Sequence, residues 1–324
     1  MAAEQQIAGK VEIHYYFSDE SQSMNAQIRN KCESSLLAMF KEISSILNAR
    51  LQVETEPYPN RKGGLSERFV LKGRSSYYQN FAAGLFYDML PLEIDLDKTV
   101  NEEDKDETKE RIDNLRRELR QAERDENAEV DMENVLHIFE HNLKINKLKS
   151  NFYKQLAGYD KVIKVSVQLF DGEEGHALGP PAAVESTLFN TFILKADVLK
   201  PETDDEAEID VVSPVLTEGN YKWKGIYVQE QKTISFAMKD EAFKAEVVKN
   251  GVAFKHGTRI KCQLEKARKM NEFGEVVVTG YTVHIVASRQ DGNVVTETTQ
   301  GKTTKKKKEP EMQQLDLFGS LFGG

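Results

Sequence analysis

Every second residue between Val11 and Phe17 is apolar. A period of two residues predicts a β-strand that turns one face towards a core. From Met24 to Leu47 the apolar residues instead recur every three or four positions, which predicts a long amphipathic helix that ends at Asn48. The first two predicted elements are therefore a strand and a helix.

Two further short strands are predicted at Leu51–Thr55 and Phe69–Leu71, on either side of a loop rich in Pro, Asn and Gly. Together with the first strand and helix they give a small β-α-β-β domain over residues 7–90. The apolar stretch Phe81–Leu90 contains Asp88 and is shorter than a membrane span. We interpret it as a buried helix and expect no membrane role.

Charged residues dominate from Asn101 to Asn127, yet Leu115 and Leu119 belong to an apolar stripe with heptad spacing. A second apolar stripe begins near Val130. The two stripes predict a helical hairpin, or a coiled-coil arm, over residues 101–156. A coiled coil would make the chain a homo-oligomer.

Strand-like segments prevail after Lys161, with one helix predicted at Asp240–Asn250 and Asp240 as its N-cap. They predict a β-rich domain over residues 161–290, either a barrel or a sandwich. From Asp291 the periodicity is lost, and we expect a disordered tail over residues 291–324. The predicted fold class is α+β, with a small α+β domain, a charged helical hairpin, a β-rich domain and a disordered tail.

Composition narrows the function classes. The chain has 324 residues, enough for two compact units, and its formal net charge of -9 argues against broad, non-specific adhesion to nucleic acid. We find no signal peptide and no run of about 18 apolar residues. Cys32 and Cys262 lie in apolar periodic segments, so we expect buried thiols and a cytoplasmic protein.

The segment His137–His141 has the sequence HIFEH and resembles the H-x-x-E-H pattern of inverted zinc peptidases. In that pattern two histidines one helical turn apart bind zinc, and the glutamate is the general base. The apolar stripe of this helix lies on the opposite side from His137 and His141. We therefore expect a charged helix face here and keep a zinc hydrolase as an alternative function.

Aromatic residues and lysines are interleaved from Tyr221 to Tyr227, a pattern that single-strand binders use for stacking and phosphate contact. In a strand, Tyr221, Trp223, Gly225 and Tyr227 would share one face, and Lys222, Lys224 and Ile226 would share the other. Trp223 is thus a candidate nucleic-acid contact. Core packing of Trp223 beside solvent-facing lysines is the preferred interpretation.

An acidic cluster at Asp204–Glu208 is interpreted as a solvated loop, with a Mg²⁺ site as the alternative. No Walker loop, Rossmann glycine fingerprint, CxxC pair or catalytic triad is recognised. The sequence therefore gives no support for catalysis and implies no cofactor.

A short segment near the C-terminal end carries the most specific pattern. Its residues are Gln314, Leu315, Asp316, Leu317 and Phe318. They fit the consensus Q-L-[S/D]-L-F at every position and resemble the motif with which many bacterial polymerases, repair factors and replication regulators bind the β sliding clamp. The resemblance implies that Leu317 and Phe318 fill an apolar pocket of the clamp, while Gln314 fixes the register.

A docking peptide works at the end of a polar tether, and the roughly 20 residues before this motif would reach about 25 Å. Four lysines of the tether are candidates for weak contacts to DNA inside the clamp, namely Lys305, Lys306, Lys307 and Lys308. We expect an accessory protein that the bacterial β sliding clamp recruits to replicating or repaired DNA, with indirect DNA association. A tail folded back onto its own domain, an oligomeric scaffold and a zinc hydrolase are the alternatives. The overall arrangement is similar to that of uncharacterised proteins of bacterial mobile elements and phage-defence loci.

Overall fold

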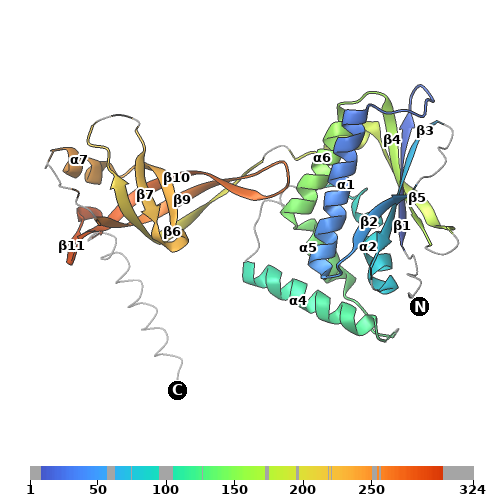
Figure 1. Cartoon of the computed structure of the whole chain (residues 1–324), viewed down its shortest axis with the longest axis horizontal. Coiled ribbons are helices and arrows are strands. Elements are labelled where there is room, and N and C mark those ends of the chain that lie inside the picture. Colours follow the sequence, from blue (N-terminus) through green and yellow to red (C-terminus); the bar gives the residue numbers. More distant parts are fainter. Residues whose placement is uncertain are drawn as a thin grey trace, which may run out of the picture. The chain divides into compact units, whose positions relative to one another are not determined.

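The computed structural model describes residues 9–56, 63–73, 75–94, 105–125, 127–171, 175–194, 197–217, 219, 221–249, 254 and 257–301. The chain forms two compact units, described one after the other below (Figure 1). Unit 1 comprises Met1–Asp197 and Met270–Glu275, and unit 2 comprises Val198–Lys269 and Val276–Gly324. None of the described helices is both long enough and apolar enough to span a membrane.

Unit 1 is built on a five-stranded antiparallel sheet. Its strands are β1 (Lys10–Phe17), β2 (Gln52–Glu56), β3 (Gly64–Lys72), β4 (Val162–Phe170) and β5 (Ala177–Glu185), in the order β2-β3-β1-β4-β5. The first four strands follow the ferredoxin-like arrangement, in which helices connect β1 to β2 and β3 to β4. The β-α-β-β order predicted for the first part of the chain is therefore confirmed.

The helices of unit 1 alternate with its strands along the chain and supply most of its core. They are α1 (Ala26–Leu47), α2 (Ser76–Met89), α4 (Lys105–Ala122), α5 (Met132–Glu140), α6 (Leu143–Ala157) and the 3-10 helix η1 (Ser186–Phe192). The Asn25 side chain caps α1 by accepting from the backbone N–H of Ile28 at 3.3 Å. α1 ends at Asn48, whose φ of 54° is left-handed, so the predicted stop is confirmed.

The core of unit 1 lies on one face of the sheet, where α1, α2 and α6 pack (Figure 1). The Phe40 ring of α1 stacks on Phe86 of α2 at a centroid distance of 4.0 Å and contacts Phe69 of β3 at 5.8 Å. Phe152 of α6 meets Tyr15 of β1 at 6.4 Å. The apolar residues of the period-two strand thus face the apolar stripes of the helices.

Two predicted boundaries differ from the observed ones. A separate domain does not begin at residue 161, because β4 pairs with β1 along its length and Val165 lies opposite Tyr15. The helical segment 101–156 is not a free arm, because Leu115 and Leu119 of α4 are fully buried in the core that also contains β1. The apolar stripe with heptad spacing is therefore used inside unit 1.

Unit 2 is a closed barrel with one added strand. Its strands are β6 (Val198–Ser213), β7 (Trp223–Tyr227), β8 (Lys232–Met238), β9 (Arg259–Met270), β10 (Val276–Asp291) and β11 (Val294–Glu297). Hydrogen bonding runs β6-β7-β8-β10-β9 and returns from β9 to β6, and β11 adds to β10. The third and fifth strands, β8 and β10, are parallel.

A helix, α7 (Glu241–Lys249), connects the third barrel strand to the fourth, and a 3-10 turn, η2 (Val228–Glu230), connects β7 to β8. This strand order with a helix in that position is the topology of the OB fold, a five-stranded Greek-key barrel. Of the two architectures predicted for the β-rich part, the barrel is the one observed.

Asp240 joins the start of α7 to the barrel. Its side chain is buried, and Oδ1 accepts from the backbone N–H of Phe243 at 2.9 Å while Oδ2 accepts from the N–H of Val286 at 2.8 Å. Phe243 and Val247 of α7 lie in the same apolar cluster as the inward residues of the strands. The N-cap predicted at Asp240 is therefore confirmed, and the same carboxylate also ties α7 to β10.

Order continues past Asp291, where a disordered tail was expected to begin. β11 pairs with β10, with Val294 opposite Asp291. Thr298 Oγ1 then donates to the Ala287 carbonyl at 3.1 Å and accepts from the N–H of Gly301 at 3.0 Å. The predicted start of the tail is therefore wrong, because residues up to Gly301 belong to unit 2. The rest of the predicted tail lies outside the described residues.

Candidate nucleic-acid interface

β7 and β8 present alternate side chains to the barrel core and to the outside. Trp223 pairs with Phe236 on the inward side, and Lys224 pairs with Ser235 on the outward side. In OB barrels the second and third strands and the adjoining loops form the surface that binds oligonucleotides and oligosaccharides. β7 and β8 occupy these two positions here.

Gly225 allows β7 to approach β6 closely. A Cβ at this position would lie 2.4 Å from Ile209 Cγ2 and 2.8 Å from the Asp210 carbonyl oxygen. Any other residue would therefore push the two strands apart and disturb the outward row that contains Lys224.

Trp223 belongs to the core and is not a nucleic-acid contact. It is 2% exposed, and its ring meets Phe236, Phe243 and Phe254 at centroid distances of 6.2, 6.1 and 5.5 Å. A ring enclosed by other aromatic rings has no free face for a base. The candidate contact at Trp223 is therefore wrong, and the interpretation as core packing is confirmed.

The exposed aromatic residue of this segment is Tyr221, just before β7. It is 65% exposed. Its ring lies close to Gly219, where φ is 140° and a Cβ would sit 2.7 Å from Tyr221 Cε2. The ring is thus held near the loop backbone while most of its surface meets solvent, as a stacking platform requires. The sequence pattern placed Tyr221 on the same face as Trp223, but Tyr221 precedes β7 and is exposed where Trp223 is buried, so this part of the prediction is wrong.

Two lysines follow Tyr221 in the chain. Lys222 and Lys224 are exposed, and within the described ranges neither has a carboxylate partner. Thr233 and Ser235 of β8 add exposed hydroxyl groups, and neither β7 nor β8 contains an acidic residue. The surface therefore combines an aromatic ring, cations and hydrogen-bond donors without opposing negative charge.

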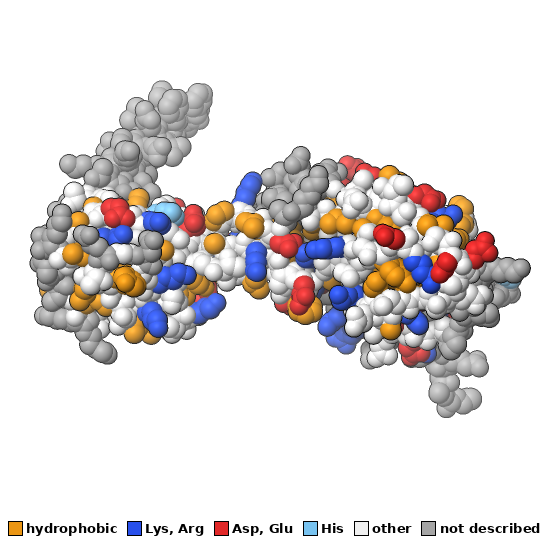
Figure 2. Space-filling model, turned by 90° about the horizontal axis from the view of Figure 1, so that it is seen from above, with side chains coloured by type: hydrophobic (Ala, Val, Ile, Leu, Met, Phe, Trp, Pro, Cys, Tyr) orange, Lys and Arg blue, Asp and Glu red, His pale blue; other side chains and the backbone are white. Residues whose placement is uncertain are grey.

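The surface formed by β6 and β9 has the opposite character. The predicted acidic loop is part of strand β6, and its carboxylates face cations of β9. Arg259 Nε lies 2.6 Å from Asp210 Oδ1, and Lys261 pairs with Glu206. These cations are already neutralised, so this surface offers little to a phosphate. On the face of the molecule in Figure 2, basic and acidic side chains are likewise intermingled.

Tyr227 anchors the end of β7. Its hydroxyl donates to Asp204 Oδ2 at 2.5 Å, and Lys266 Nζ lies 4.8 Å from the ring centroid. Burial and the hydrogen bond with Asp204 raise the pKa of Tyr227 to about 12, so the phenol stays neutral. The outward residues of β7 are therefore carried by a strand that is fixed to β6.

The two histidines of the HIFEH segment are together in space but do not form a zinc pair. The rings of His137 and His141 are stacked, with centroids 4.1 Å apart and planes at 23°. Stacked rings direct their in-plane nitrogens side by side, whereas zinc at about 2.0 to 2.1 Å from each nitrogen needs them to converge. Across the described ranges, no three His, Cys, Asp or Glu side chains are grouped for a metal ion.

The remaining predicted site residues lie elsewhere. Cys32 and Cys262 are buried and not in a disulfide, as predicted. The clamp-motif residues Gln314–Phe318 and the tether lysines Lys305–Lys308 lie outside the described residues.

The comparisons with known proteins add no assignment. The chain matches no protein-family model and has no significant match among curated proteins or among solved structures. The candidate interface therefore depends on the topology of unit 2 and on the side chains that β7 and β8 present.

Proposed function

We propose that the chain holds single-stranded nucleic acid on the outer face of β7 and β8, and that its C-terminal peptide recruits it to a bacterial sliding clamp. It would then be a non-catalytic accessory protein of DNA replication or repair. The observation that carries the first part is the exposed Tyr221 ring, followed in the chain by the exposed Lys222 and Lys224, at the second strand of an OB barrel.

The chemistry of this surface suits a single strand. Each base of a single strand exposes a ring face that can stack on Tyr221, and the phosphates next to it can pair with Lys222 and Lys224. A duplex hides the ring faces of its bases. The net charge of -9 opposes non-specific adhesion, so binding should depend on this local surface.

Fluorescence anisotropy with a labelled oligothymidine and the full chain tests this part. Because base–aromatic stacking contributes about 1 to 3 kcal/mol, we expect Tyr221→Ala to weaken binding by roughly 5- to 150-fold. Lys224→Glu should also weaken oligothymidine binding, and it should make the affinity less dependent on salt concentration. The matched control is Lys261→Glu, which reverses a lysine on the β6 and β9 surface. Equal losses from both charge reversals would rule out the assignment to β7 and β8.

The second part is supported by the motif residues Gln314–Phe318 and by their place after a polar, lysine-containing segment. Burying Leu317 and Phe318 in the clamp is worth roughly 3 to 6 kcal/mol of contact, out of about 8 kcal/mol for a micromolar peptide. Calorimetry of a peptide spanning Glu311 to Gly324 against purified bacterial clamp should therefore detect binding. The peptide with Leu317→Ala and Phe318→Ala should show none. Equal heats from the two peptides would refute recruitment by the clamp.

The oligomeric scaffold is the less favoured alternative, because α4 buries Leu115 and Leu119 in its own unit. Light scattering of the full chain should give the mass of a monomer. A stable dimer that dissociates when exposed residues of α4 are changed to Glu would restore the scaffold hypothesis.

A further inference from the structure

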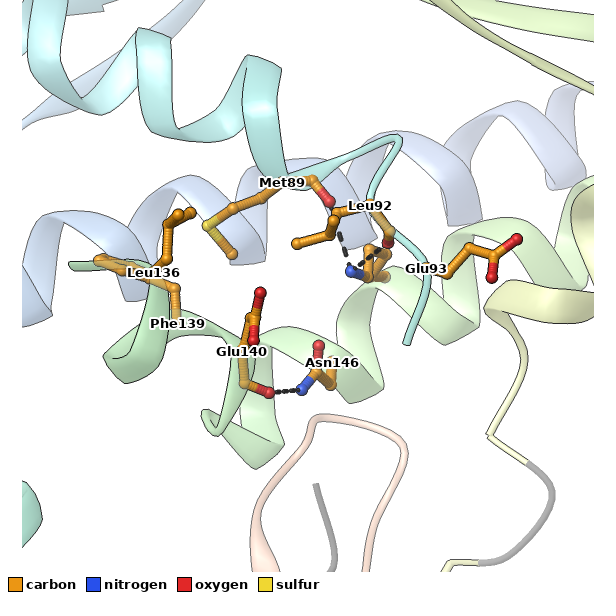
Figure 3. Close-up of a pocket in the computed structure, with 8 residues that line it drawn as sticks. Met89, Leu92, Glu93, Leu136, Phe139, Glu140 and Asn146 are labelled. Carbon is orange, nitrogen blue, oxygen red and sulfur yellow. Dashed lines mark hydrogen bonds between the residues drawn. The ribbon is translucent and has the colours of Figure 1, made fainter. Parts of the chain in front are cut away.

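Unit 1 contains a pocket that the proposed function does not use. It has a volume of about 180 Å³ and lies between the end of α2, α5 and α6 (Figure 3). Pockets for drug-sized ligands run roughly 300 to 1,000 Å³. This one therefore suits a smaller group, such as one apolar side chain of another protein.

The apolar wall of the pocket continues along the surface of α5. Met89 and Phe139 line the pocket and are buried, whereas Leu92 and Leu136 line it and are 37% and 39% exposed. Met132 lies one helical turn before Leu136 and is 45% exposed, so these two side chains form a short apolar stripe beside the pocket. Large apolar side chains that meet water next to a cavity gain from being covered by an apolar group.

Two polar side chains of the lining are already held within unit 1. Lys149 is 2% exposed, and its ammonium donates to the Leu92 carbonyl at 2.7 Å and to the Met89 carbonyl at 3.3 Å. Asn146 is 3% exposed and donates through Nδ2 to the Glu140 carbonyl at 2.6 Å (Figure 3). An apolar side chain that enters the pocket would therefore remove little of either residue from water.

The surroundings of the pocket are acidic. Residues 125–143 include six Asp or Glu residues and no Lys or Arg. Glu133 directly follows Met132 and is exposed, and Glu93 lines the pocket and is also exposed. Among the described residues, neither carboxylate belongs to an ion pair, and Lys144, the first cation after the acidic run, pairs with Glu42 at 2.7 Å. The field beside the apolar stripe thus favours a cationic partner.

We propose that the pocket and the stripe of Met132 and Leu136 bind a basic amphipathic helix of a partner protein. One Leu, Ile or Met side chain of that helix enters the pocket, and a second, one helical turn away, covers Met132. Lysines or arginines beside these anchors pair with Glu133 and Glu93. Amphipathic helices dock in apolar grooves through anchors at this spacing, and charge complementarity selects a basic helix over an acidic one.

Fluorescence anisotropy of the full chain with a labelled amphipathic peptide of leucine and lysine tests the proposal. Two matched peptides separate the contributions, one with glutamate in place of every lysine and one with alanine in place of every leucine. We expect saturable micromolar binding of the first peptide and at least about tenfold weaker binding of both matched peptides. Absence of saturable binding at about a hundred micromolar, or equal binding of the glutamate peptide, would overturn the proposal.

Two substitutions locate the binding. Leu136→Ser removes an anchor contact and should weaken the leucine and lysine peptide about tenfold, whereas the control Leu178→Ser changes an exposed leucine of β5 and should not. Glu133→Lys should weaken it about fivefold, unlike the control Asp160→Lys at an exposed position beyond α6. Equal effects of both charge reversals, or unchanged binding in Leu136→Ser, would refute this site.

Discussion

Both units carry charged pairs across neighbouring strands, and two of these pairs differ sharply in burial. In unit 1, Arg68 of β3 lies 3.0 Å from Glu12 of β1, and the two side chains are 7% and 1% exposed. In unit 2, Lys261 of β9 pairs with Glu206 of β6, and these side chains are 43% and 66% exposed. One cross-strand pair is therefore shielded from solvent and the other is exposed to it.

The buried pair belongs to a continuous polar layer. His14 Nδ1 lies 2.7 Å from Ser66 Oγ, and the Arg68 guanidinium sits 4.3 Å above the Phe170 ring. Gly64 makes room for the imidazole, because a Cβ there would lie 2.9 Å from His14 Nε2. Buried polar groups need every partner, whereas exposed pairs can exchange a partner for water. The contribution of such a pair to the stability of its unit therefore depends on how deeply the pair is buried.

The largest effect is expected for Arg68→Met, which would leave the Glu12 carboxylate buried beside an apolar side chain. Breaking a buried ion pair from one side costs about 3 to 5 kcal/mol of unfolding free energy. Urea unfolding followed by far-UV circular dichroism measures this loss. Trp223 is the one tryptophan of the chain and lies in unit 2. The urea midpoint measured by tryptophan fluorescence should therefore not change.

The double variant Glu12→Gln with Arg68→Met is the control for Arg68→Met. It removes both charges of the pair and should recover part of the loss, because no buried carboxylate then remains beside the apolar side chain. A loss below about 1 kcal/mol in the single variant would contradict burial as the deciding factor.

A second prediction concerns the pH dependence that Lys149 gives to unit 1. Its pKa of about 8 in the folded chain lies below the value of about 10.4 expected when unfolded. Below the folded pKa both states bind the proton and the burial penalty is complete. Between the two pKa values the unfolded state binds more protons, so stability rises with pH by up to about 3 kcal/mol.

The measurement is urea unfolding at several pH values from neutral to alkaline, with Lys149→Met as the reference. Other lysines and tyrosines titrate equally in both proteins, so the difference between the two profiles isolates Lys149. The wild-type protein should gain stability relative to the variant as the pH rises above 8. Parallel profiles would show that the Lys149 ammonium is not destabilised by burial.

Asp240 is a buried charge of unit 2, and its partners are backbone N–H groups. Replacing an N-cap aspartate by alanine costs about 0.5 to 2 kcal/mol. Asp240→Ala should lie near the upper end, because the bond to the Val286 N–H is lost as well. In Asp240→Ala, the urea midpoint measured by tryptophan fluorescence should therefore fall. Asp240→Asn retains one acceptor and should lose less, and an equal loss in both variants would argue against the second bond.

The elements predicted from sequence are those that depend on neighbouring residues. The helix with its stop at Asn48 and the helix with its cap at Asp240 follow from side chains within a few positions. The pairing of strands does not follow from nearby residues in this way. β4 has the same apolar alternation as a barrel strand, and its position beside β1 is decided by contacts between Val165 and Tyr15, far apart in the chain.

The candidate sites divide in the same way. Alternation along β7 correctly places Trp223 inside and Lys224 outside. Tyr221 is exposed just before the start of β7, and the pocket around Lys149 is lined by residues of three helices. Neither feature has a periodic signal, because both arise from the packing of segments that are distant in sequence.

The smallest effect is expected for Lys261→Met, and it completes the comparison with Arg68→Met. Both substitutions remove the cation of a cross-strand pair and leave a flexible apolar side chain of similar length. In the exposed pair, water solvates the remaining Glu206 carboxylate, so the unfolding free energy should change by less than about 0.5 kcal/mol. Tryptophan fluorescence in urea measures this change in unit 2. Raising the salt concentration should shrink the difference further, because exposed charges are screened. A loss in Lys261→Met as large as in Arg68→Met would mean that pair geometry, and not burial, decides the contribution of the two pairs.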